Sequence, residues 1–126
     1  MGVTNLDALT LSGNAIIGGT STINGVVLGA TETLTAAGAI SLVTGETALA
    51  LAGAGAVTLA APTKNIMKII TMTADNGDVT LALTNVVGGT AATTCTFNDV
   101  NDILILVADL ARAKWVVIKE VGVGMA

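Results

Sequence analysis

The chain has 126 residues and a formal net charge of −4, with 52% hydrophobic residues and only 11% charged residues. It contains no histidine, tyrosine or glutamine, but has 21 alanines, 19 threonines and 15 glycines. Catalysis needs groups that ionise near the working pH or that activate a nucleophile, so this composition predicts a protein that is not an enzyme.

Residues 1–30 are predicted to form an extended, glycine-rich N-terminal arm. An aliphatic-x-Gly unit recurs every six residues, at Leu11-Ser12-Gly13, Ile17-Gly18-Gly19 and Ile23-Asn24-Gly25. A six-residue phase is typical of β-solenoid coils or of short strands that turn at each glycine. Three units are too few for a solenoid that stands alone. We therefore expect an arm, or a stalk wound with its counterparts from other subunits; the alternative is a hairpin of the main domain.

A second repeat predicts strands after residue 30. A glycine followed by an x-aliphatic-hydroxyl-Leu pattern recurs at Gly38-Ala39-Ile40-Ser41-Leu42, Gly55-Ala56-Val57-Thr58-Leu59 and Gly77-Asp78-Val79-Thr80-Leu81. The glycine closes a turn, and the residues after it alternate between the two faces of a strand. The apolar segment 47–63 is short for a membrane span, is interrupted by glycines and Pro62, and alternates like a strand. We therefore expect no membrane partner.

Strand patterns continue to the end of the chain. Residues 67–73 lead into Asp75-Asn76-Gly77-Asp78, where Asn-Gly predicts a β-hairpin. Further strands are predicted over residues 93–97, 103–108 and 115–120. Residues 103–108 are apolar throughout, which predicts a strand covered on both faces. About nine short strands in all predict an all-β fold, an antiparallel β-sandwich or jelly-roll-like domain over residues 31–126.

Few residues could carry chemistry. The chain has no P-loop, nucleophile elbow or zinc ligand set, so we assign no catalytic, cofactor-binding or metal-binding residue and expect no cofactor. Two acidic segments, residues 75–78 and 98–102, offer oxygen ligands that calcium accepts, but Asp and Asn also favour turns. Cys95 is the single cysteine and is interpreted as an inert core thiol. Trp115 is interpreted as a core or interface residue rather than a platform for sugar stacking.

Charge and core composition indicate the kind of partner. The five cations form no basic patch: they are Lys64, Lys68, Arg112, Lys114 and Lys119. Binding to phosphates is therefore unexpected, and we predict no nucleic-acid partner. The core is poor in large side chains, with one Phe and one Trp. Alanine buries little apolar area, so we expect an obligate homo-oligomer, with three copies as the expected number.

Several segments resemble small virion proteins of tailed bacteriophages. They are Asp78-Val79-Thr80-Leu81, Gly88-Gly89-Thr90, Thr96-Phe97, Ile103-Leu104-Ile105-Leu106-Val107 and Lys114-Trp115-Val116-Val117-Ile118. Residues 9–20 also resemble the glycine-punctuated openings of phage fibre and head proteins. One departure is Ala111-Arg112-Ala113, which lengthens the link before Trp115 beyond the short glycine turn of those proteins.

The resemblance implies a head decoration (cement) protein or a head-fibre protein, commonly a homotrimer. A decoration protein would bind the major capsid protein on the outside of the phage head and stabilise the shell. Its location would be the capsid surface of the virion, after assembly in the host cytoplasm. The alternative is a fibre or spike segment that takes part in attachment to a host surface. The resemblance carries over no site residues.

Overall fold

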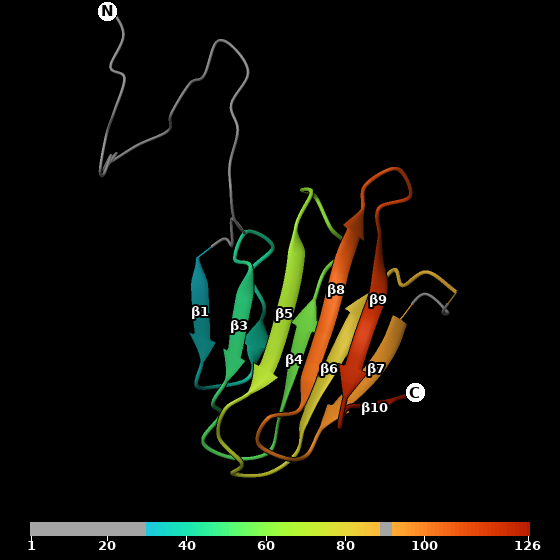
Figure 1. Cartoon of the computed structure of the whole chain (residues 1–126). Coiled ribbons are helices and arrows are strands. Elements are labelled where there is room, and N and C mark those ends of the chain that lie inside the picture. The colour runs from blue at the N-terminus through green and yellow to red at the C-terminus, as the bar shows by residue number, and fades with distance from the viewer. Residues whose placement is uncertain (1–29, 89–91) are drawn as a thin grey trace, which may run out of the picture.

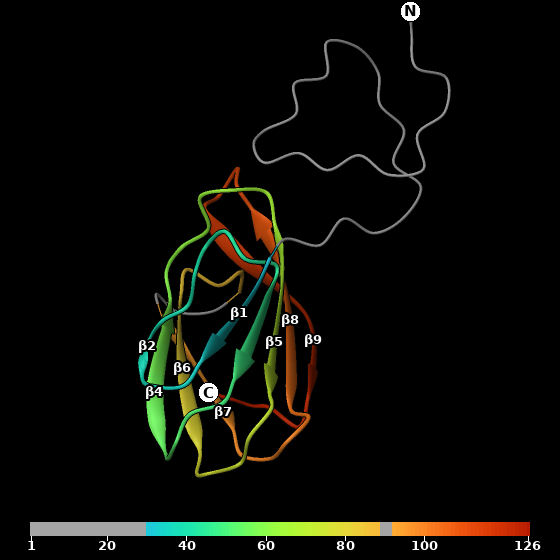
Figure 2. The same ribbon diagram turned by 90° about the vertical axis from the view of Figure 1, so that its left-hand side faces the viewer.

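The predicted all-β sandwich is confirmed. The structure, a computed structural model, describes residues 30–88 and 92–126, and their ten strands form two five-stranded sheets that face each other (Figures 1 and 2). Sheet A has the order β1 (Thr31–Leu34), β3 (Glu46–Leu49), β5 (Met67–Met72), β8 (Ile103–Asp109) and β9 (Lys114–Val121). Sheet B has the order β10 (Gly124–Met125), β7 (Ala92–Phe97), β6 (Val79–Thr84), β4 (Gly55–Leu59) and β2 (Gly38–Ala39). The arm predicted for residues 1–30 lies, except for its last residue, outside the described residues.

The first six strands alternate between the two sheets. One strand of sheet A and one strand of sheet B together make one turn of a flattened coil, and three such turns stack side by side (Figure 2). As a result β1, β3 and β5 are parallel neighbours in sheet A, and β2, β4 and β6 are parallel neighbours in sheet B. Parallel neighbours need a long crossover connection. Here the strand in the opposite sheet is part of that connection.

The last four strands complete the sandwich with antiparallel pairs. β7 pairs with β6, β8 with β5, β9 with β8 and β10 with β7. β8 and β9 form a hairpin whose turn holds Ala113 at a φ of 51°. The expected antiparallel pairing is therefore right for the pairs that β7–β10 make and wrong for the pairs among β1–β6. Alternation in a sequence determines which side chains share a face, but it does not determine the direction of the neighbouring strand.

The turn at Asn76-Gly77 does not form the predicted hairpin. β5 lies in sheet A and β6 lies in sheet B, so this turn carries the chain across the sandwich. Asn76 Nδ2 donates a 2.8 Å hydrogen bond to Leu51 O, which lies in the connection between β3 and β4, one turn earlier in the flattened coil. Gly77 has a φ of 130°, and a Cβ there would overlap the backbone of Ala54. The glycine therefore permits two successive connections to pack together.

The glycine-aliphatic-hydroxyl-Leu repeat falls on sheet B. Its three copies begin at Gly38, Gly55 and Gly77 and coincide with β2, β4 and β6, which are neighbouring strands. Val57 on β4 is level with Leu81 on β6, and both side chains are completely buried. A repeat along the sequence therefore becomes a stack of parallel strands that contribute the same face to the core.

The core lies between the two sheets. The outer face of β8 is not covered by another described element, contrary to the prediction. Leu104 and Leu106 point inward and are completely buried. Ile103, Ile105 and Val107 alternate with them and are only half-buried on the outer face of sheet A. The prediction that both faces of residues 103–108 are covered is therefore wrong within the described part of the chain.

Candidate functional site

The two acidic segments use their polar side chains to hold turns. Asp102 is 5% exposed, and its Oδ2 accepts hydrogen bonds from the backbone N–H groups of Asn98 (2.9 Å) and Asp99 (3.1 Å). In the segment 75–78, Asn76 holds the adjacent connection through Leu51. Across residues 30–88 and 92–126, no three His, Cys, Asp or Glu side chains are grouped as metal ligands. The turn interpretation accounts for the bonds that Asp102 and Asn76 make.

Cys95 and Trp115 both lie in the core, as expected. Cys95 is completely buried, its Sγ lies 3.2 Å from Met125 Sδ, and burial raises the pKa of its thiol to about 11. The thiol is therefore protonated at neutral pH and is a weak nucleophile. Trp115 is also completely buried, and its indole N–H donates a 2.8 Å hydrogen bond to Ala60 O. That bond connects β9 of sheet A to the residue that follows β4 of sheet B.

A buried ion pair is the main polar feature of the interior. Lys68 on β5 has no exposed surface, and its Nζ lies 3.2 Å from Glu32 Oε1 on β1. The same Nζ donates to Ser41 O (2.9 Å), Thr44 O (2.9 Å) and Thr44 Oγ1 (2.6 Å). Four oxygen atoms therefore replace the water that the ammonium loses.

Glu32 is held from several sides as well. Its Oε1 accepts hydrogen bonds from Thr47 Oγ1 (2.7 Å), the Ser41 backbone N–H (2.9 Å) and Thr44 Oγ1 (3.0 Å). Glu32, Ser41, Thr44, Thr47 and Lys68 are called the Lys68 cluster below. These residues come from β1, β3, β5 and the connection between β2 and β3. The cluster therefore fastens the first turn of the flattened coil to the next two turns.

The electrostatics of the Lys68 cluster point to a structural role. Burial alone would raise the pKa of Glu32, but hydrogen bonds from Thr47, Lys68, Ser41 and Thr44 outweigh that effect and lower it. Burial lowers the pKa of Lys68, and Glu32 opposes that change. Every buried side-chain nitrogen and oxygen in the described residues has a hydrogen-bond partner. A cluster whose buried nitrogen and oxygen atoms all have partners joins β1, β3 and β5 in the interior of the fold.

Strand alternation could have located this lysine. Lys68, Ile70 and Met72 occupy alternate positions of β5, and all three are completely buried. Two inward hydrophobic residues on one strand predict that the third position also faces the core. The acidic partner could not be found in this way, because Glu32 lies in a short threonine-rich strand without a strong apolar pattern.

The outer face of sheet A carries a continuous set of aliphatic side chains. The aliphatic face consists of Met67, Ile69, Ile103, Ile105, Val107, Val116 and Val121 on β5, β8 and β9, together with the exposed Ile118, which lies where the register between β8 and β9 shifts by one residue. Ile69 is level with Ile105, and Met67 is level with Val107. Ile118 is 57% exposed and Val121 is 51% exposed. Figures 1 and 2 show no other described element in front of this face.

The outer face of sheet B has a different chemistry. On its central strands β4, β6 and β7 it carries only alanine and threonine: Ala56, Thr58, Thr80, Ala82, Thr84, Thr94 and Thr96. Threonine hydroxyls remain solvated at little cost, whereas a large exposed aliphatic patch favours burial against another molecule. The sandwich therefore has one face suited to water and one face suited to a partner.

No protein-family model, curated protein or solved structure matches the chain. Among residues 30–88 and 92–126, no helix has the length and apolar character to cross a membrane. The aliphatic face is the candidate functional site, because large exposed aliphatic side chains favour burial against another molecule.

Proposed function

We propose that this chain is a structural virion protein, a decoration (cement) subunit that binds the outside of a tailed-phage head and stabilises the shell. The aliphatic face of sheet A is the observation that carries the proposal. Buried interface centres are rich in apolar side chains and poor in charged ones, as this face is. The resemblance of segments within residues 78–118 to small phage virion proteins supplies the class of assembly.

Such a subunit acts by mass action and not by catalysis. A protein that binds the assembled lattice but not its separated subunits shifts the equilibrium toward the lattice. The proposed partners are the major capsid protein and other copies of this chain in a homotrimer, with no nucleic acid or membrane involved. Residues 1–30 are proposed to contribute to attachment to the capsid.

A fibre or spike segment is the second candidate, and the coil of β1–β6 favours it. Within residues 30–88 and 92–126, β1 and β2 are the edge strands of the two sheets at the same end of the stack. Edge strands present unpaired backbone groups to which further parallel strands can add, and solenoids lengthen by that kind of stacking. A subunit of this design would suit an elongated part of the virion that attaches to a host surface.

The test uses phage heads from which the chain has been removed. Purified chain should sediment with expanded heads, reach saturation at a fixed number per lattice repeat, and raise the temperature at which the heads disrupt. Ile105→Asp, on the aliphatic face, should abolish these effects, and Thr80→Asp, on the outer face of sheet B, should preserve them. Association only with tails would support the fibre candidate, and association with neither would contradict both.

A further inference from the structure

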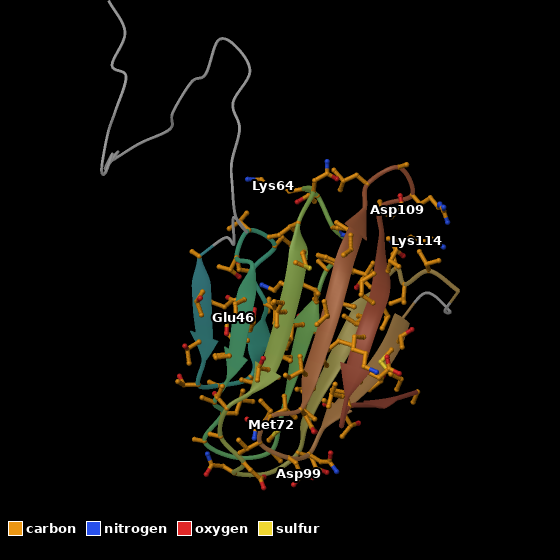
Figure 3. All side chains as sticks on the ribbon, viewed as in Figure 1. Glu46, Lys64, Met72, Asp99, Asp109 and Lys114 are labelled. Carbon is orange, nitrogen blue, oxygen red and sulfur yellow. The ribbon has the colours of Figure 1, made fainter. Side chains whose placement is uncertain are left out.

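Two opposite charges lie at opposite margins of the aliphatic face. Hydrogen-bonded neighbours place four residues level with one another across sheet A, in the order Glu46 (β3), Ile69 (β5), Ile105 (β8) and Lys119 (β9). Glu46 is half-buried, and Lys119 is exposed. Figure 3 labels Glu46 on β3, beside the sheet region that carries the aliphatic side chains. The row is therefore negative at one end, aliphatic in the middle and positive at the other end.

We propose that the aliphatic face binds a second copy of this chain, with the symmetry axis parallel to the strands of sheet A. This inference rests on the proposed role of the face in association and names its partner. An axis in this direction brings the Glu46 margin of one copy to the Lys119 margin of the next. At the same time it places the central isoleucines of the two copies, Ile69 and Ile105, against each other.

The charge pattern selects both the partner and the axis. Rotation of the second copy about an axis across the strands would place Glu46 against Glu46 and Lys119 against Lys119, and like charges at an interface disfavour association. Rotation about an axis along the strands makes both margins complementary. An unrelated partner would need a matching pattern of its own, whereas a second copy has it already. Both a two-fold and a three-fold axis parallel to the strands satisfy this arrangement.

The experiment is a charge exchange read out by native mass spectrometry and sedimentation equilibrium on the full chain. The wild type should form a dimer or trimer at micromolar concentration. Glu46→Lys and Lys119→Glu should each weaken association by about tenfold or more, because each places like charges together. The double variant Glu46→Lys/Lys119→Glu should return to within about threefold of the wild type, because it restores opposite charges at both margins.

Two controls separate association from folding. Far-ultraviolet circular dichroism should remain that of the wild type in all the variants, and Thr80→Asp on the outer face of sheet B should leave the oligomer unchanged. A monomeric wild type would overturn the inference, as would a double variant that associates no better than the single variants. A monomer that still binds phage heads would overturn this inference and the proposed homotrimer, and would leave the role as a decoration subunit standing.

Discussion

Replacing Glu32 by alanine should destabilise the fold more than any surface substitution. The change leaves the Lys68 ammonium with no exposed surface and no countercharge, while Ser41 O, Thr44 O and Thr44 Oγ1 remain as its acceptors. Removing one partner of a buried ion pair costs about 3–5 kcal/mol. The Glu32 side chain is 19% exposed, so water can partly replace it and the lower end, about 3 kcal/mol, applies. For a domain of about 100 residues, that corresponds to a melting temperature lower by roughly 12–24 °C.

The assay is thermal and urea unfolding followed by circular dichroism. The double variant Glu32→Leu/Lys68→Met should recover at least half of the loss, because an apolar pair of similar volume leaves no isolated charge. Lys64→Met removes the same positive charge as Lys68→Met, but from an exposed position (Figure 3). It should change the free energy of unfolding by less than about 0.5 kcal/mol. A loss below about 1 kcal/mol for Glu32→Ala, or a double variant no more stable than the single one, would refute the assigned role of the pair.

Three further outcomes follow from the interior. The folded-state pKa of Glu32 is lowered, so its contribution to stability is present above the unfolded pKa of 4.5 and is lost as pH falls through the folded value. When the free energy of unfolding is measured at decreasing pH, Glu32→Gln should therefore lose less stability than the wild type. Gly122 has a φ of 74°, and a Cβ there would overlap Asp102 Oδ1. Gly122→Ala should therefore lower the free energy of unfolding in urea by about 1–3 kcal/mol. Gly38→Ala is the control: a Cβ there would meet open space, and the loss should be less than about 1 kcal/mol. Cys95 is completely buried with a thiol pKa of about 11, so a maleimide should label it only at the rate of unfolding, and rapid labelling of the native protein would contradict its placement.

The strand content of the described residues was predictable because alternation and glycine spacing are local signals. The Gly55 repeat coincides with β4, and the apolar segment that begins at Ile103 coincides with β8. The pairing of the strands was not predictable in the same way. The Asn76-Gly77 turn has the same sequence signal whether it returns the chain to the same sheet or carries it to the other one. The crossing depends on contacts with Leu51 and Ala54, which are distant in the sequence.

The candidate site was predictable only in part. Low charge density and a poor aromatic core predicted that the chain associates, but not through which surface. The candidate surface is formed only when β5, β8 and β9 lie side by side, because Ile69 and Ile105 come from strands far apart in the chain. The continuous apolar run that begins at Ile103 was interpreted as a strand covered on both faces within the fold. In the described residues one of those faces is open, which is what makes it a candidate interface.

A cryo-electron microscopy map of the virion, at a resolution that separates the strands, would show whether the aliphatic face of sheet A is buried in the assembled state. We expect density for this domain on the head lattice, with Ile105 of one copy packed against a second copy and Glu46 beside Lys119 of that copy. A map in which sheet A faces solvent while the threonine-rich face of sheet B is buried would contradict this expectation.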